Sequence, residues 1–210
     1  MTRNYVVTAA HCLKGVDDSR STVRVGEHNQ DHTNEEYSHT DFTVTTKIHP
    51  RYDSSSYDYD VAVIKLDQPI DFQPHVVPIC LAKKDQDFTG QTATLSGWGH
   101  EVKYGNVQSV LKSVNVPILT NEECTRMFRA NGHHDNISDR MLCAGVTNGG
   151  RDSCQADSGG PLVAKVDGRF TLAGIVSWGY GCGDKAQPGV NARVAELRDW
   201  IVANTDYNDY

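Results

Sequence analysis

The stretch Asp152-Ser-Cys-Gln-Ala-Asp-Ser-Gly-Gly-Pro161 places Ser158 between an aspartate and a glycine turn. A serine hydroxyl is an effective nucleophile only when a neighbouring base takes its proton and backbone N–H groups hold the oxyanion that forms. Gly159 and Gly160 tolerate backbone angles that a side chain would forbid, so this turn can present Ser158 outward. The alternative interpretation is a glycine-rich surface turn beside a disulfide. A base, an orienting acid and a binding pocket elsewhere in the chain would favour the first interpretation.

Composition excludes several classes of protein. The chain has 210 residues and a formal net charge of −7, with no basic run, which argues against a nucleic-acid or anionic-membrane partner. It contains no apolar run of the roughly 20 residues that a membrane helix needs. Six cysteines in a turn-rich chain indicate an oxidising compartment, so we expect a secreted, extracellular protein.

Hydrophobic patterning predicts an all-β chain. Short β-prone runs separated by Gly and Pro turns recur throughout, and Phe42, Val44, Thr46 and Ile48 alternate with polar residues as in a half-buried strand. Helical patterns are predicted for residues 121–128, with Thr120 as the N-cap, and for residues 195–204. The charged break at 83–87 suggests an N-terminal β unit (1–82) and a C-terminal β unit (83–194), followed by a helix and tail (195–210).

Two further residues have the character of an acid–base pair. His11 lies in Thr8-Ala-Ala-His-Cys12, where small alanines permit close packing and the cysteine can fix the segment. Asp60 precedes the apolar run Val61-Ala-Val-Ile-Lys-Leu66, and a carboxylate at the mouth of a buried strand is costly unless it is paired. A histidine N–H is a natural partner for Asp60. Taken singly, a histidine or an aspartate in such a position is more often an ordinary structural residue.

The three segments occur in the order His, Asp, Ser, and together they resemble the chymotrypsin/trypsin family of serine endopeptidases. Supporting motifs are Ser96-Gly-Trp-Gly99, Met141-Leu-Cys-Ala-Gly145, Ser177-Trp-Gly179 and Pro188-Gly-Val190. The resemblance implies two antiparallel Greek-key β-barrels with a C-terminal α-helix. It also implies that the first barrel is incomplete, because the chain starts after the family's usual N-terminus.

The resemblance assigns chemical roles, following a Ser–His–Asp template that is itself drawn from this family. Ser158 is the nucleophile, His11 the base and then the acid, and Asp60 the residue that orients the imidazole. The N–H groups of Ala156 and Ser158 form the oxyanion hole. Ser177 hydrogen-bonds the aspartate, and the backbone around Trp178 and Gly179 pairs with the substrate.

The same family resemblance implies a substrate specificity. Asp152 corresponds to the floor of the primary pocket, where a buried negative charge selects Arg or Lys, and Gly179 and Gly189 correspond to its walls. The alternative is a surface aspartate that precedes a disulfide. Tyr57 resembles the wall of the neighbouring subsite, which a tyrosine would narrow in favour of small residues.

The six cysteines divide into two groups by resemblance. Cys124 is expected to pair with Cys143, and Cys154 with Cys182. Cys12 and Cys80 are left without partners in this chain, as expected for an N-terminally truncated one, and Cys80 matches a cysteine that ties the catalytic domain to an upstream chain or regulatory module.

Three positions depart from the family. The family's activating N-terminus, which pairs with the aspartate before the serine (here Asp157), is missing, so residues 1–210 alone are expected to be weakly active or inactive. Ala156 stands where the family has a glycine that tolerates positive φ more readily. Asn191 stands where relatives usually carry a tyrosine behind the pocket floor.

The loop from Gly26 to Glu36 resembles the family's calcium loop, with Glu27 and Glu36 as ligands and Glu35 as an alternative; a solvated acidic loop explains the same residues. No other cofactor is expected. The sequence therefore predicts a secreted serine endopeptidase, made as a zymogen, that cleaves proteins or peptides after Arg or Lys and is restrained by protein protease inhibitors. A catalytically silent homologue that acts as a binding or regulatory protein is the alternative, and a disulfide-rich binding module is a more remote one.

Overall fold

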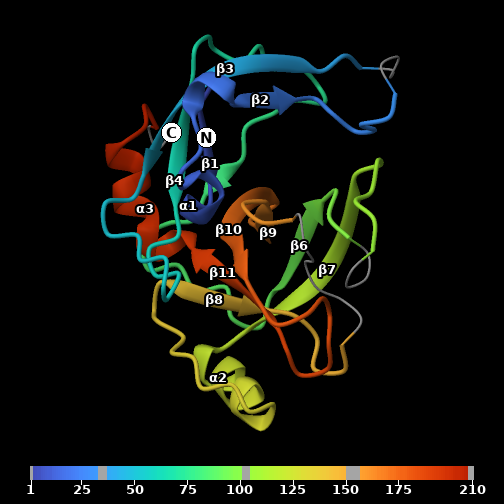
Figure 1. The fold of residues 1–210 in the computed structure, drawn as a ribbon, viewed down its shortest axis with the longest axis vertical. Helices are drawn as coiled ribbons and strands as arrows, with labels where there is room; N and C mark the ends of the chain where they lie inside the picture. Colours follow the sequence, from blue (N-terminus) through green and yellow to red (C-terminus); the bar gives the residue numbers. More distant parts are fainter. Residues whose placement is uncertain (1, 33–36, 101–104, 150–156, 208–210) are drawn as a thin grey trace.

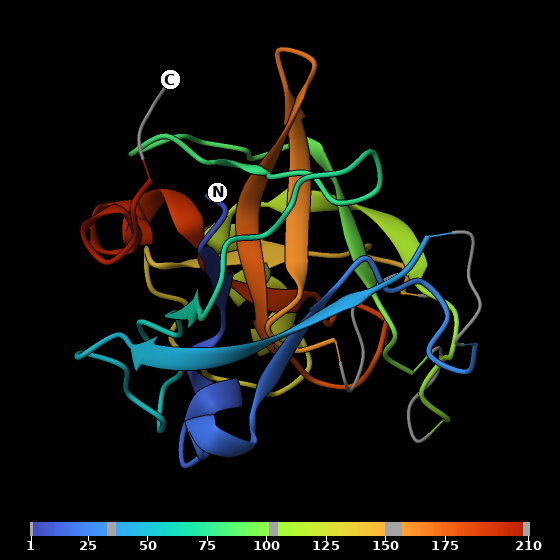
Figure 2. The same ribbon diagram turned by 90° about the horizontal axis from the view of Figure 1, so that it is seen from above.

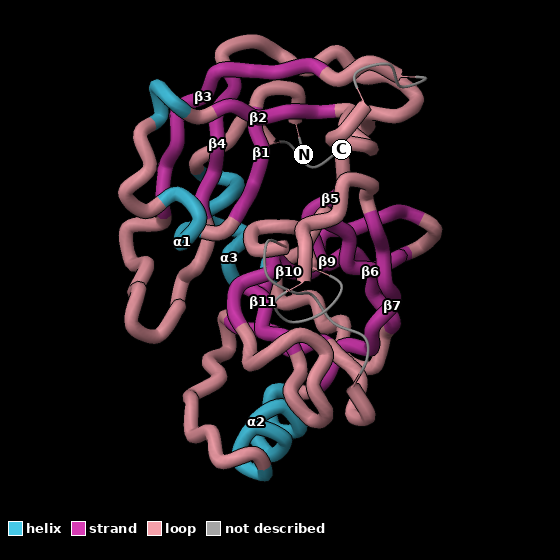
Figure 3. Tube along the Cα trace, turned by 45° about the vertical axis from the view of Figure 1, so that its right-hand side comes forward, coloured by secondary structure: helices cyan, strands magenta, loops and turns pink. Residues whose placement is uncertain are grey.

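Two β-sheets stacked end to end account for the architecture (Figure 1). The computed structural model describes residues 2–32, 37–100, 105–149 and 157–207. The first sheet forms the upper layer in Figure 3 and the second lies beneath it, with one helix beyond its far end.

The first sheet has four antiparallel strands in the order β1-β4-β3-β2. Their bounds are Tyr5–Thr8 (β1), Thr22–Val25 (β2), Thr40–Ile48 (β3) and Ala62–Leu66 (β4). Phe42 is buried while its neighbours Asp41 and Thr43 are exposed, which confirms the predicted alternation along β3. β4 lies between β1 and β3, which explains why its sequence is almost wholly apolar.

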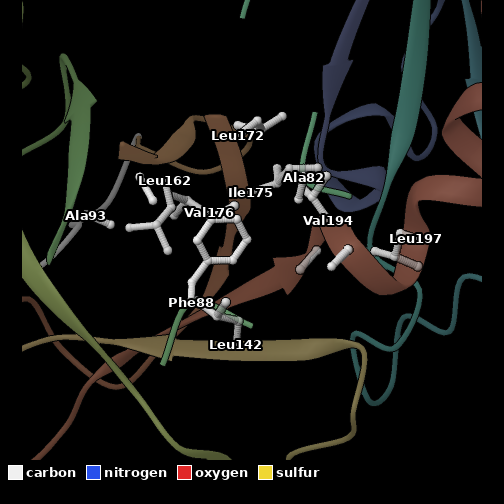
Figure 4. Packing of buried hydrophobic residues seen from close by; sticks show 14 of the residues in the cluster. Ala82, Phe88, Ala93, Leu142, Leu162, Leu172, Ile175, Val176, Val194 and Leu197 are labelled. Atoms are coloured by element: carbon white, nitrogen blue, oxygen red, sulfur yellow. The ribbon is translucent and has the colours of Figure 1, made fainter. Parts of the chain in front are cut away.

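The second sheet closes on itself. Its strands run in the order β11-β8-β7-β6-β9-β10, and β10 also pairs with β11, which makes a six-stranded barrel. Their bounds are Thr92–Gly97 (β6), Lys112–Leu119 (β7), Met141–Ala144 (β8), Pro161–Val166 (β9), Arg169–Trp178 (β10) and Gly189–Arg193 (β11). Phe88, 1% exposed, lies among Leu142, Leu162 and Val176 in the main core (Figure 4).

A closed barrel joined to a half-barrel sheet confirms the predicted all-β fold with an incomplete first barrel. Cys80–Leu81 forms a short strand, β5, that the sequence patterning does not predict; it runs parallel to β10 and extends the second sheet. Seen from above, the orange β9–β10 hairpin crosses the middle of the molecule between α3 and the β6–β7 side of the barrel (Figure 2).

Helices occupy the edges of the two sheets. α1 (Ala10–Leu13) follows β1 directly, and a short 3-10 helix, η1 (Asp18–Arg20), precedes β2. α2 (Asn121–Ala130) begins with a capping box between Thr120 and Glu123, which confirms the predicted N-cap. α3 (Val194–Ala203) packs on β10, β11 and β5. The two chain ends lie together, where Asn4 Nδ2 donates to Asp206 Oδ2 at 2.7 Å.

Candidate active site

His11 and Asp60 meet because β1 and β4 are antiparallel partners. Thr8, at the end of β1, pairs with Ala62, at the start of β4, so the segments that follow and precede these strands are neighbours. Asp60 Oδ2 lies 2.7 Å from His11 Nδ1, and the backbone N–H of His11 donates to Asp60 Oδ1 at 2.8 Å. The hydrogen bond to Asp60 raises the pKa of His11 above its ordinary value, because the carboxylate favours the imidazolium.

Ser177 completes the surroundings of Asp60 from the second barrel. Its hydroxyl donates to Asp60 Oδ2 at 2.5 Å, across the junction of the two sheets. Asp60 is 0% exposed, and a buried carboxylate is tolerated when hydrogen bonds replace the lost water. Donors from both sheets therefore hold Asp60 in one orientation, with the imidazole as its principal partner.

The turn that carries Ser158 packs tightly against the segment that carries His11. Gly159 donates its N–H to Val176 O at 2.8 Å and has φ +79°. A Cβ at Gly159 would lie 2.3 Å from Thr8 Oγ1 and 3.1 Å from Cys12 Sγ, so only glycine fits without displacement. This contact brings the nucleophile turn and the His11 helix together.

Ser158 itself is exposed at the tip of that turn. Among the described residues no hydrogen bond joins Ser158 to His11, whose Nε2 lies 3.5 Å from the thiol of Cys12. In enzymes without substrate, catalytic hydrogen bonds are often long and tighten only when substrate binds. The predicted nucleophile, Ser158, and the predicted base, His11, are thus on adjoining segments, while their direct contact stays a prediction.

Asp157, next to Ser158, is held by a part of the chain to which sequence reasoning gave no role. The N–H of Gly99 donates to Asp157 Oδ1 at 2.9 Å. A Cβ at Gly97 would lie 2.1 Å from that oxygen, and a Cβ at Gly99 would lie 2.4 Å from the carboxyl carbon. The glycines of Ser96-Gly-Trp-Gly99 therefore leave room for the Asp157 carboxylate.

The structure describes only some of the predicted pocket residues. Asp152, Ala156 and Cys154 lie outside the described residues. Gly179 and Gly189 face each other: among the described residues, a Cβ built on Gly179 would contact only Gly189 Cα, at 3.6 Å. A side chain at either position would narrow the space between them, which fits the predicted role of the two glycines as pocket walls.

Tyr57 and Trp178 lie at two edges of the site. The Tyr57 ring meets the His11 ring edge-on, with centroids 5.6 Å apart, and its side chain is exposed. Trp178 packs against Phe128 and Tyr180 in a second apolar cluster beneath the β10–β11 bulge. The predicted subsite at Tyr57 is thus beside the base, and its preference for small residues stays a prediction.

Asn191, the departure behind the pocket, is buried at 2% exposure. Its Nδ2 donates to Leu142 O of β8 at 3.3 Å and to Gly189 O of its own strand, β11, at 3.4 Å. The Asn191 side chain thereby links the start of β11 to β8.

The structure tests some of the predictions for the six cysteines. Cys124 and Cys143 form a disulfide, as predicted. Cys182 is also disulfide-bonded, and its predicted partner, Cys154, lies outside the described residues. Cys12 and Cys80 are free thiols in this structure, both half-buried.

Glu27, the described member of the predicted calcium pair, has partners within the chain. Its Oε2 accepts from Arg24 Nη1 at 3.1 Å and lies 3.6 Å from His39 Nδ1. Glu36 and Glu35 lie outside the described residues. Within the described part of the chain, no group of three or more His, Cys, Asp or Glu side chains is arranged to hold a metal ion. Calcium binding stays a prediction from the sequence.

The closed barrel, the half-barrel and the His–Asp pair at their junction define a protein of the trypsin class. The family model described as Trypsin matches residues 1–201, so the chain belongs to the trypsin family of serine proteases.

Three curated relatives show the same likeness along 96% of this chain. It is 45% identical over 204 residues to "Serine proteinase stubble" of Drosophila melanogaster and 42% identical over 205 residues to "Serine protease filzig" of the same organism. It is also 41% identical over 203 residues to "Trypsin-1" of Astacus astacus. The matched region spans 26% of stubble, 12% of filzig and 84% of Trypsin-1. No helix among the described residues is long and apolar enough to cross a membrane.

Proposed function

We propose that this chain is a serine endopeptidase that cleaves protein substrates after Arg or Lys. The observation that carries the proposal is the orientation of Asp60: fully buried, it receives hydrogen bonds from the His11 ring, the His11 backbone and the Ser177 hydroxyl. A carboxylate fixed in this way holds the imidazole in the tautomer whose Nε2 can accept a proton.

The reaction that follows needs only side chains and backbone of the chain. Ser158 Oγ attacks the scissile carbonyl carbon while His11 Nε2 takes the hydroxyl proton. The carbon–nitrogen bond then breaks, His11 returns the proton to the leaving amine, and an acyl-enzyme remains until water hydrolyses it. The amides of Ala156 and Ser158 stabilise the oxyanion, and Asp152 binds the substrate cation between Gly179 and Gly189. No cofactor takes part.

The proposal also covers where the protein acts and what it binds. Six cysteines, with a disulfide formed, favour a secreted protein that matures from a zymogen. Cys80, a half-buried thiol on β5, is the proposed attachment point for an upstream chain or regulatory module, and protein protease inhibitors are the proposed regulators.

The test, made on the full-length, activated protein, is covalent labelling with a fluorophosphonate probe, followed by hydrolysis of matched Arg-, Lys- and Phe-amide substrates. We expect Ser158 to be labelled, Ser158→Ala to be unlabelled, and the Arg and Lys amides to be the ones cleaved. Asp152→Ser should remove that preference, because a buried cation loses its counter-charge. An unlabelled, correctly folded wild-type protein would instead favour the catalytically silent homologue.

A further inference from the structure

Two of the three residues before Asp60 adopt an unusual backbone conformation. Tyr57 and Tyr59 have φ of +57° and +56°, a left-handed conformation that bulky side chains rarely adopt. The N–H of Val61 then donates to Tyr59 O at 2.7 Å, so Asp60 is the central residue of a three-residue turn. Such a backbone persists only where the surroundings hold it in place.

Asp58, between the two strained tyrosines, is bound by the second barrel. Arg140, immediately before β8, donates from Nε to Asp58 Oδ1 at 2.9 Å and from Nη2 to Oδ2 at 2.7 Å. Ser138 Oγ donates to Oδ1 at 3.0 Å. The Asp58 and Arg140 side chains are 21% and 31% exposed, and a two-pronged contact between a guanidinium and a carboxylate is geometrically specific.

Charge and burial compete at Asp58. Burial alone opposes ionisation, but the hydrogen bonds from Arg140 and Ser138 outweigh it and leave the pKa of Asp58 below its ordinary value. The ion pair is therefore formed at neutral pH.

Tyr59 is fixed from several sides by the same arrangement. The guanidinium carbons of Arg140 and Arg51 lie 4.4 and 4.3 Å from its ring centroid, and the His49 ring stacks on it at 4.7 Å. His49 in turn packs on Trp200 of α3 at 4.8 Å. Both Asp58 and Tyr59, which precede Asp60, are thus anchored outside the first sheet.

We propose that Arg140 is a positioning residue for the triad: by holding Asp58 it keeps the strained turn in the shape that aims Asp60 at His11. This inference rests on the proposed function, because it gives the His11–Asp60 pair a catalytic purpose. A partly exposed ion pair contributes little to global stability, so its effect should appear in the orientation of Asp60.

The test compares Arg140→Met, Arg140→Lys and Asp58→Asn with the wild-type protein. The substrate is a blocked arginine amide with no residue before the arginine, which leaves the subsite at Tyr57 empty. Rates are normalised by active-site titration, so that loss of folded protein cannot imitate loss of turnover. Arg24→Met is the matched control, because Arg24 makes a similar two-pronged contact with Asp41 on the β2–β3 hairpin.

We expect kcat to fall about tenfold in Arg140→Met with little change in KM, since one weakened hydrogen bond in the transition state changes kcat and not substrate affinity. Arg140→Lys should recover only part of the loss, because a lysine keeps the charge but not the planar fork. Arg24→Met should match the wild type.

A second readout separates positioning from mere structure. Among the described residues, the groups in contact with the His11 ring are Asp60, the Cys12 thiol and Tyr57. A weaker hydrogen bond to Asp60 should lower the pKa of His11 in Arg140→Met and move the acid limb of the kcat/KM profile to lower pH. Simple removal of a positive charge would raise that pKa instead, so the sign of the shift decides between the two effects.

Three results would overturn the proposal: an unchanged kcat with an unchanged His11 pKa, a change in KM alone, or a lower melting temperature with normal titrated turnover. If Arg140→Met does not fold, Arg140→Lys and Asp58→Asn give the same comparison. The His11 pKa is measured by NMR titration and needs no turnover. A wild-type protein that fluorophosphonate does not label would therefore refute the proposed function, while unaltered His11 titration in the variants would refute the positioning role.

Discussion

The two β units hold their parts of the site in different ways. In the first sheet, His11 and Asp60 lie on a four-residue helix and a strained turn, and side-chain hydrogen bonds and an ion pair fix them. In the second barrel, Ser158 precedes β9, Gly179 follows β10 and Gly189 begins β11, and strand pairing and an apolar core fix them. Polar substitutions near the first sheet should therefore change activity, and apolar substitutions in the second barrel should change stability.

The largest effect should come from Asp60→Asn, which tests the polar side of this comparison. The neutral amide keeps the shape but cannot stabilise the imidazolium, and in the Ser–His–Asp template drawn from this family the same change lowers kcat about 10⁴-fold. The pKa of His11 should also fall, because the hydrogen bond to the Asp60 carboxylate is what raises it. Steady-state kinetics and NMR titration measure the two effects. A loss of less than tenfold would mean that Asp60 does not act on the base.

Removal of a core side chain tests the prediction that apolar substitutions change stability. Phe128 is 0% exposed in the cluster beneath Trp178, and Phe128→Ala should lower the free energy of unfolding by about 3–5 kcal/mol. Phe42→Ala is the counterpart in the first sheet, where the side chain is 8% exposed in a cluster of four buried residues. Because water reaches that site more easily, we expect a smaller loss by urea denaturation. Equal losses would contradict the claimed difference between the two units.

How much of this site the sequence could predict depends on the kind of contact. His11, Asp60, Ser158 and Ser177 were predictable because short motifs identify them, although the motifs gave no distances. The Asp58–Arg140 contact joins residues 82 positions apart, in a loop and before a strand, and no local pattern relates them. The left-handed backbone at Tyr57 and Tyr59 was equally hidden, because tyrosine gives no signal for it.

The fold, like the site, contains elements that a local sequence pattern predicts and elements that it does not. The half-buried strand β3 was predictable because its residues alternate along nine positions. β5 was not, because two residues display no period and its partner β10 is far along the chain. Gly97 and Gly99 were noticed as part of a motif, but only the position of the Asp157 carboxylate explains why they are glycines.

Gly99→Ala should have an intermediate effect on kcat. Gly99 combines the two kinds of support, because its backbone N–H donates to the Asp157 side chain. Its Cβ would lie 2.4–2.5 Å from the Asp157 carboxylate and would displace the residue that precedes Ser158. We expect kcat to fall by about tenfold or more, since the loss of one oxyanion donor typically costs about 10²–10³. Stopped-flow acylation kinetics provide the measurement.

Gly132→Ala is the control for that substitution. Gly132 has φ +81°, and a Cβ at this position would have no neighbouring atom within 4 Å, so alanine there meets strain without a clash. The substitution should cost about 1–2 kcal/mol of stability and leave kcat unchanged. A similar fall in kcat in both variants would show that the loss does not come from contact with the Asp157 carboxylate.

The smallest effect concerns two histidines with opposite pKa shifts. The pKa of His11 is raised by Asp60, whereas that of His49, 7% exposed, is lowered, first by burial and then by the charge of Arg51, with Asp58 opposing. Each has an ordinary pKa of 6.5. His11 therefore stabilises the folded state fully below that value and less as the pH rises toward its folded pKa. His49 contributes above that value, and its contribution is lost as the pH falls toward its own folded pKa.

Together these two shifts predict a maximum of stability near pH 6.5, the pKa from which both depart. Urea denaturation of the wild type should show the free energy of unfolding falling on the acid side of that maximum. In His49→Asn the acid-side slope should flatten, because the unfolded state no longer takes up an extra proton there, while the alkaline side should keep its slope. The asparagine Oδ1 can still accept the hydrogen bond that Arg51 N now donates to His49 Nδ1 at 3.1 Å, so the loop should remain formed. An acid-side slope that is identical in the two proteins would mean that His49 is not held neutral by the fold, and that the contrast between the two histidines fails.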